Sequence, residues 1–400
     1  MPNATKLIMI LDRELDTILG LLKCYIMGAP APIVAKPGLD WQRLLQLCNV
    51  HRVTPLVHRL LKASEGVPAA VLEKWRGIVL NQSAMTIRAA HELTRLLDSF
   101  RAVGKTVIPF KGHVLAAELY DDATQRPGID FDLYVAKKHI PDILQALSEL
   151  GYTSSMLQHV SGRSVTSRFY SLEFSHPTKT PIDLHWDITD GYVSRLLSSQ
   201  QLTGAVRPFE FGGRTIEIFD QNVTLALLAV HGGKASWASL SAWMDLALFF
   251  RRFPHYSYST VLHVLRERGV ARMLYVGAHL VERFFDVPAP RLIKQNMDYR
   301  SVEISRLIGH RLFEQPLQPA AAGWRKVLLN LQLREKSSEK LRYLWFKARP
   351  KKVDVAARGS AGVGKVRRVI GGAGKREKGE GKLETENRKP EAGKRETGSE

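Results

Sequence analysis

The spacing of apolar residues predicts helices at the start of the chain. Leucines and valines recur at roughly helical intervals between residues 44 and 61, as they do on one face of a helix. A longer stretch, residues 72–100, repeats this spacing. No catalytic constellation stands out in these segments. We therefore expect residues 1–103 to form an N-terminal helical region that serves packing.

The pattern changes at Gly104 to short β-prone runs separated by helical spacings. Strands are predicted at 106–110, 131–135, 168–174 and 181–186, with a hairpin at 206–219 that turns at Gly212-Gly213. Helices are predicted at 114–120 and 140–150. Gly151 ends the second helix, because glycine tolerates the left-handed conformation there. Strands interleaved with helices predict a small mixed sheet over residues 104–219.

Helical spacing returns after the hairpin and predicts a C-terminal helical domain at 220–347. The final residues, 348–400, differ in composition. Their last fifty hold 10 of the 30 glycines and no aromatic residue, so they have no face to bury and predict a disordered basic Gly-rich tail. The expected fold class is therefore α+β, with a small mixed-sheet core flanked by N-terminal and C-terminal helical regions.

Composition excludes several classes of protein. The 400 residues are 44% hydrophobic and 24% charged, which is ordinary for a globular chain and excludes wholesale disorder and fibrous rods. Cys24 and Cys48 are too few for a zinc cluster or a disulfide scaffold. The apolar N-terminal stretch at 7–27 carries five charged residues, too many for a membrane span or signal peptide. We expect a cytoplasmic protein without a membrane span.

The net charge of +19 invites a nucleic-acid interpretation. Residues 351–400 contribute +6 of it, from 14 basic and 8 acidic residues, and the rest is scattered. An RNA-binding protein stays open on charge alone, but no aromatic-basic motif supports it.

Two aspartates carry the chemistry that we consider most informative. Asp130 and Asp132 alternate on a predicted strand, so their carboxylates point to the same face. Two adjacent negative charges raise each other's pKa unless a cation lies between them. Mg²⁺ is the natural cation, because it prefers oxygen ligands. A solvated turn is the alternative interpretation of the pair.

Three features around the pair strengthen the metal-site interpretation. Lys111-Gly112 lies between a strand and a helix, where backbone N–H groups can approach a phosphate. Arg126 is placed to reach a phosphate oxygen. Asp183 lies on the apolar strand 181–186, where an ionised group needs a partner. If the two strands adjoin, three carboxylates converge: two can hold Mg²⁺ and the third can accept a proton from a hydroxyl.

The chain resembles the polymerase-β-type nucleotidyltransferase superfamily, and more narrowly its uncharacterised bacterial nucleotidyltransferase branch. The resemblance covers roughly residues 40–310. It rests on these features, in order: Lys111-Gly112, Leu119-Tyr120, Arg126, Asp130-Phe-Asp-Leu-Tyr-Val135, Ile182-Asp-Leu-His-Trp186, His231-Gly-Gly-Lys-Ala-Ser-Trp237 and Trp243-Met-Asp245. The chain departs from the superfamily's usual pattern at His113, where serine is usual. It also departs at Ile129, where glycine is usual, and at Tyr134, which replaces a leucine. The spacing from Trp243 to Asp245 is also one residue shorter.

The resemblance implies Mg²⁺-dependent in-line transfer of a nucleoside monophosphate from an NTP, with ATP the expected one, to a hydroxyl acceptor. Asp130, Asp132 and Asp183 would hold Mg²⁺ and form the catalytic trio. Nucleotide-binding residues would be Lys111, Gly112, Arg126, His231 and Lys234. The acceptor, a small molecule or a protein, stays unidentified.

Alternatives remain for single residues and for the whole function. Lys111 could cap surface charge, His231 could be a core histidine, and Lys234 could pair with Asp245. Asp183 could pair with an arginine such as Arg168. We expect His185 and Trp186 to orient and cover the neighbouring strand, with Trp186 a core residue. The chain could also transfer another phosphoryl group at the same site. It could instead be a catalytically degenerate nucleotidyltransferase fold that serves as a binding or regulatory module.

Overall fold

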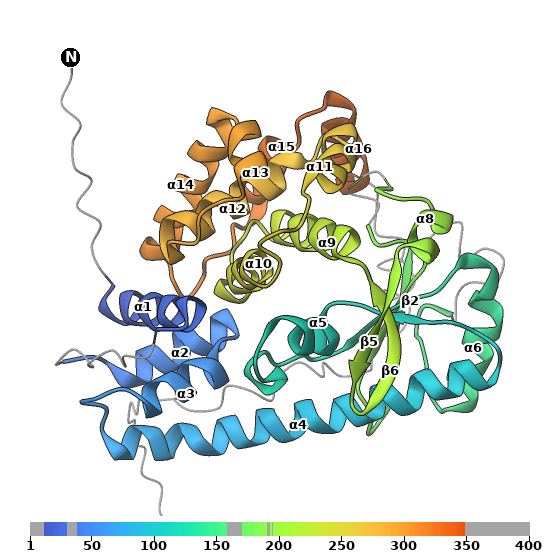
Figure 1. The fold of residues 1–400 in the computed structure, drawn as a ribbon, viewed down its shortest axis with the longest axis horizontal. Coiled ribbons are helices and arrows are strands. Elements are labelled where there is room, and N and C mark those ends of the chain that lie inside the picture. The colour runs from blue at the N-terminus through green and yellow to red at the C-terminus, as the bar shows by residue number, and fades with distance from the viewer. Residues whose placement is uncertain (1–11, 30–37, 158–169, 190–192, 194, 349–400) are drawn as a thin grey trace, which may run out of the picture. The chain divides into compact units, whose positions relative to one another are not determined.

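The computed structural model describes residues 12–29, 38–157, 170–189, 193 and 195–348 (Figure 1). The segment predicted as a tail, 348–400, lies outside the described residues except for Ala348, which ends the last helix. The first two residues of the strand predicted at 168–174 also lie outside them, and these include Arg168.

Four helices confirm the prediction for the N-terminal region. They are α1 (Arg13–Met27), α2 (Trp41–His51), α3 (Thr54–Lys62) and α4 (Ala69–Ala102). Asp12 and Asp40 cap the first two, because each carboxylate accepts hydrogen bonds from N–H groups of the first turn. The helix predicted at 72–100 is α4, which in Figure 1 passes α5 and the hairpin β5–β6.

The central sheet has four short strands in the order β1-β2-β4-β3. These are β1 (Ile108–Pro109), β2 (Phe131–Tyr134), β3 (Ser171–Phe174) and β4 (Ile182–His185). The central strands β2 and β4 run parallel, while β1 and β3 pair antiparallel with them. The sheet is therefore mixed, as predicted.

The two faces of the sheet differ in chemistry. Phe131 and Leu133 of β2 and Leu184 of β4 enter a buried apolar cluster with α4 and α6 (Ile140–Glu149). Because side chains alternate along a strand, Asp132 and Asp183 project to the opposite face. That face meets α9 (Gln221–Lys234) through a second cluster that includes Tyr134, Val223 and Leu227.

Smaller elements complete the core. The helix α5 (Gly112–Leu119) follows β1, and the 3-10 turns η1 (Ala123–Gln125) and η2 (Lys137–His139) flank β2. The hairpin β5 (Val206–Phe211) and β6 (Arg214–Phe219) follows α8 (Ser199–Gly204) and forms its own two-stranded sheet. Gly212 and Gly213 have φ of 58° and 75°, as the predicted turn requires. Gly151, with φ of 83°, confirms the predicted end of α6.

The C-terminal region is helical, as predicted. After α9 it contains α10 (Leu240–Arg252), α11 (Ser259–Glu267), α12 (Ala271–Phe285), α13 (Arg291–Asn296), α14 (Tyr299–Glu314), α15 (Gly323–Gln332) and α16 (Ser337–Ala348). The first helix, α1, packs against α10 and α12 (Figure 1). The two helical regions that flank the sheet in sequence thus share one apolar core. The structure is α+β. Among the described residues, no helix is both long and apolar enough to cross a membrane.

Candidate active site

The parallel pairing of β2 and β4 places two of the predicted carboxylates side by side. In this register Asp132 lies directly opposite Asp183. Asp130 precedes β2 by one residue, and two positions separate it from Asp132, so both side chains project to the same face. The apolar residues between them enter the core on the other face, so the hydrophobic pattern of the strands itself directs the acids toward α9.

A histidine joins the aspartates, and the sequence interpretation gave it only an orienting role. His185 Nε2 lies 2.9 Å from Asp183 Oδ2 and 3.2 Å from Asp132 Oδ1. His185 is buried and lies on the same face of β4 as Asp183. The signal was present as Asp-x-His on an apolar strand, since residues two apart share a face.

Lys111 supplies a cation to the carboxylates. Its Nζ lies 2.9 Å from Asp132 Oδ1, so it does not merely cap surface charge. The Lys111 backbone has φ of 59° and ψ of −154°, a region that is essentially reserved for glycine and costs on the order of 1–3 kcal/mol. Gly112, the first residue of α5, also has a positive φ, of 41°. The strained turn directs the Lys111 ammonium into the acidic face of the sheet.

The pKa values of the two neighbouring aspartates are shifted in opposite directions. Burial and the negative charge of Asp132 raise the pKa of Asp130. The pKa of Asp132 lies well below its usual range although burial opposes this, because Lys111 and His185 stabilise its ionised form. Lys111 and His185 therefore stabilise the ionised form of Asp132, whereas Asp130 has no hydrogen bond or ion pair within the described ranges.

The donor set fits a divalent cation. Asp132, Asp183 and His185 each offer one ligand atom, and the three atoms lie within 4.8 Å of one another. Asp183 Oδ1 is buried and has no hydrogen-bond partner in the part of the chain that is described. A buried carboxylate oxygen without a partner is the kind of group that an ion or a water satisfies. Asp130 lies next to this set and does not belong to it.

Arg126 is engaged by the protein. Its Nε and Nη2 donate to the two carboxylate oxygens of Asp245 at 2.7 and 2.8 Å, and Nη1 donates to the Gly112 carbonyl at 3.0 Å. Tyr120 donates to the same carboxylate at 2.9 Å. The buried Arg126–Asp245 pair thus ties the start of α5 to α10. Asp245 thus has Arg126 and Tyr120 as partners, and the alternative ion pair between Lys234 and Asp245 stays a prediction.

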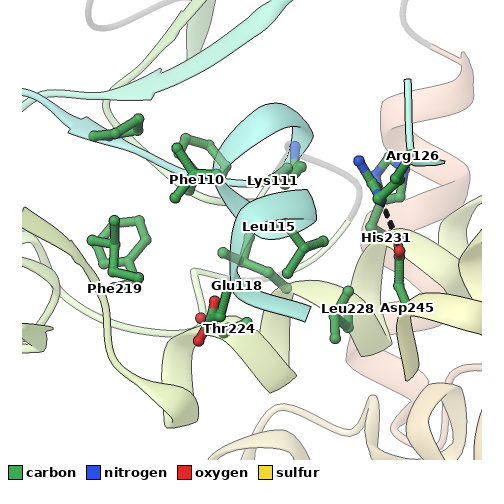
Figure 2. Close-up of a pocket in the computed structure, with 14 residues that line it drawn as sticks. Phe110, Lys111, Leu115, Glu118, Arg126, Phe219, Thr224, Leu228, His231 and Asp245 are labelled. Carbon is green, nitrogen blue, oxygen red and sulfur yellow. Dashed lines mark hydrogen bonds and ion pairs between the residues drawn. The ribbon is translucent and has the colours of Figure 1, made fainter. Parts of the chain in front are cut away.

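His231 and Lys234 lie on the last turn of α9 and line a cavity with Lys111 and His185. His231 also lines a neighbouring cavity beside Arg126 and Asp245 (Figure 2). It is exposed, so the core-histidine alternative is wrong. Desolvation of the ring, followed by the positive charges of Lys111 and Lys234, lowers the pKa of His231, which favours the neutral ring.

The two tryptophans of the resemblance hold helices together. Trp237 Nε1 donates to the Met273 carbonyl at 2.9 Å, and Trp243 Nε1 donates to the Trp237 carbonyl at 2.7 Å. Gly277 leaves room for Trp237, because a Cβ there would lie 2.3 Å from the indole ring. Trp186 is likewise a core residue, as predicted.

The comparisons agree with this geometry. A family model described as uncharacterised nucleotidyltransferase matches residues 37–286, which include every predicted site residue. No curated protein matches the chain. The match covers more than half of the chain and includes both central strands and α9. The chain belongs to the uncharacterised nucleotidyltransferase family.

Proposed function

We propose that the protein transfers a nucleoside monophosphate from an NTP to a hydroxyl acceptor and releases pyrophosphate. The observation that carries this proposal is the pairing of Asp132 with Asp183 across parallel strands, beside Lys111 and the start of α5. Family membership supports nucleotidyl transfer in general. Substrate class, metal dependence and in-line geometry are parts of the proposal.

Each residue has a role that its position suggests. Asp132 and Asp183, with Asp130 beside them, would hold a divalent cation, for which Mg²⁺ is the expectation. When bound, such a cation supplies charge neutralisation for the phosphates and orients the reacting groups. Asp183 accepts the proton of the acceptor hydroxyl, since its carboxylate lies opposite Asp132 on the same face of the sheet.

The residues of α5 and α9 provide the nucleotide contacts. Lys111 and the N–H groups at the start of α5 face the phosphates, as the positive end of a helix favours anions. His231 and Lys234 line the adjoining cavity and contact the nucleotide from α9. Arg126 acts by positioning the Gly112 turn through its bond to the Gly112 carbonyl.

A two-label assay tests the proposal. The full-length protein is incubated with each NTP, labelled at either the α- or the γ-phosphate, with Mg²⁺ and with or without cell extract. Nucleotidyl transfer moves the α-label to an acceptor and releases the γ-label in pyrophosphate. Transfer of the γ-label to an acceptor would show that the site transfers a phosphoryl group, the alternative enzyme activity.

A binding or regulatory module is the second candidate, and one observation favours it. Buried carboxylates without a favourable partner would argue against a degenerate site. Asp132 does not lack such partners, because Lys111 and His185 contact its carboxylate within the protein. Asp132 itself therefore does not need a cation for stability. Saturable NTP binding without release of pyrophosphate, under any cation or extract, would support this candidate.

A further inference from the structure

We infer that His185 is a nitrogen ligand of the metal and that the site prefers a divalent first-row transition ion, such as Mn²⁺, to Mg²⁺. The inference rests on the proposed function only for the use of the metal. Its claim concerns the ligand set, Asp132, Asp183 and His185, and it can be tested by metal binding alone.

The spacing of the three ligand atoms matches an octahedral ion. Neighbouring ligands at about 2.1 Å from such an ion lie about 3 Å apart. His185 Nε2 lies 2.9 Å from Asp183 Oδ2 and 3.2 Å from Asp132 Oδ1. The nitrogen can therefore lie next to each carboxylate oxygen around one ion, and all three ligand atoms lie within 4.8 Å of one another.

The imidazole is already held in place. The central strand β4 carries it, and the His185 carbonyl accepts a hydrogen bond of 2.8 Å from Val135 N. The Phe110 ring packs against it edge to face, with centroids 5.1 Å apart. His185 is 6% exposed, so few other orientations are open to it. Ligands held in this way lose little freedom when a cation binds.

Asp183 supplies an independent argument. One of its oxygens contacts His185, and the other is buried without a partner in the described structure. A hydrogen bond from His185 alone leaves that second oxygen unsatisfied. A cation beside the carboxylate satisfies it, because a carboxylate can bind a metal through either or both oxygens.

The nitrogen donor determines the preference for a metal. Mg²⁺ binds oxygen ligands and seldom exchanges them for imidazole, whereas transition ions accept imidazole readily. Mn²⁺ is the transition ion that shares most with Mg²⁺ in its affinity for carboxylates. In the metal-bound state Nε2 gives its lone pair to the metal, and the ring hydrogen lies on Nδ1.

Binding measurements on the full-length protein test the ligand set. Free Mn²⁺ is followed by electron paramagnetic resonance, and Mg²⁺ is added as a competitor. We expect Mn²⁺ to bind at least about tenfold more tightly than Mg²⁺, and His185→Gln to reduce this ratio to about threefold or less. The control is His91→Gln, the same substitution at an exposed position on α4. An unchanged ratio in His185→Gln would overturn the inference.

A spectroscopic measurement on the unmodified protein tests the nitrogen ligand without relying on the His185→Gln variant. Electron spin echo modulation of the Mn²⁺ complex of the unmodified protein should show a directly coordinated nitrogen, and ¹⁵N-histidine labelling should change that signal. Bound Mn²⁺ without nitrogen coupling contradicts the inference even if His185→Gln fails to fold. Nitrogen coupling without any NTP turnover would leave the ligand set intact and count only against the proposed function.

Discussion

At the scale of single residues, Asp130 and Asp132 show how position sets chemistry. Both aspartates belong to the same short stretch, yet their partners differ. Lys111 and His185 contact the Asp132 carboxylate, and no described group forms a hydrogen bond or ion pair with the Asp130 side chain. Asp130 and Asp132, only two positions apart, therefore differ: the ionised form of Asp132 is stabilised and that of Asp130 is destabilised. This difference can be measured without knowing the substrate.

We predict that, in the absence of divalent metal, Asp130→Asn is as stable as the wild type or more stable, because the variant loses a carboxylate whose ionised form is disfavoured. Asp132→Asn should lose about 1.5–3 kcal/mol, since Lys111 and His185 lose their charged acceptor. Urea unfolding of both variants in chelator, at neutral pH, measures the difference. Equal losses in the two variants would contradict the assigned charge pattern. Both substitutions should abolish metal-dependent transfer.

At the scale of elements, the Arg126–Asp245 pair connects the start of α5 with α10. It lies behind the Lys111-Gly112 turn, because Arg126 also donates to the Gly112 carbonyl. The side chains of Arg126 and Asp245 are 17% and 5% exposed. A charge left alone at this depth is costly, whereas an apolar pair can be tolerated.

We predict that Asp245→Leu costs about 3–5 kcal/mol and that the double variant Arg126→Leu/Asp245→Leu costs less than Asp245→Leu alone. The physical reason is that the single variant leaves the Arg126 guanidinium buried without its carboxylate. Urea unfolding of both singles and the double completes the cycle. If the losses simply add, the pair is not coupled and α5 is held by other contacts.

Sequence patterns predicted the elements better than their pairing. Apolar periodicity was sufficient for α4, α6 and the central strands, because burial of one face is a local property of the sequence. The parallel register of β2 and β4 was not accessible, because some fifty residues separate the two strands. The pairing of Arg126 with Asp245 was not accessible for the same reason, since the two residues lie 119 positions apart. His185 was placed on the correct strand, but only pairing of the strands brings it to Asp132.

At the scale of the whole molecule, the N-terminal and C-terminal helices depend on each other. His51, at the end of α2, is a buried contact between them. Its Nε2 lies 3.0 Å from the Pro316 carbonyl, and its Nδ1 accepts from Leu240 N at the start of α10, at 3.4 Å. Burial lowers the pKa of His51 to about 4. The contact therefore requires a neutral ring.

We predict that acidification weakens this contact. A lowered histidine pKa means that the unfolded chain binds more protons between about pH 6.5 and 4, so stability falls as the pH falls through that window. The loss attributable to His51 should reach roughly 3 kcal/mol near pH 4. His51→Gln keeps a donor for Pro316 but does not titrate. Its unfolding free energy should therefore fall less steeply than that of the wild type, and parallel curves would contradict the prediction.

The central claim is that the carboxylates of β2 and β4 carry out nucleotidyl transfer, and Asp183→Asn tests it most directly. Asparagine keeps the shape of the side chain but loses its charge and most of its basicity. NTP affinity should weaken only modestly, because the phosphate and base contacts remain. The decisive measurement is the single-turnover rate with the NTP and cation that support transfer, taken on preparations whose melting temperature and NTP affinity are also measured. The account predicts a fall of about 10²–10⁴ in that rate. A destabilised protein with an undiminished single-turnover rate would contradict it and remove Asp183 from the catalytic residues.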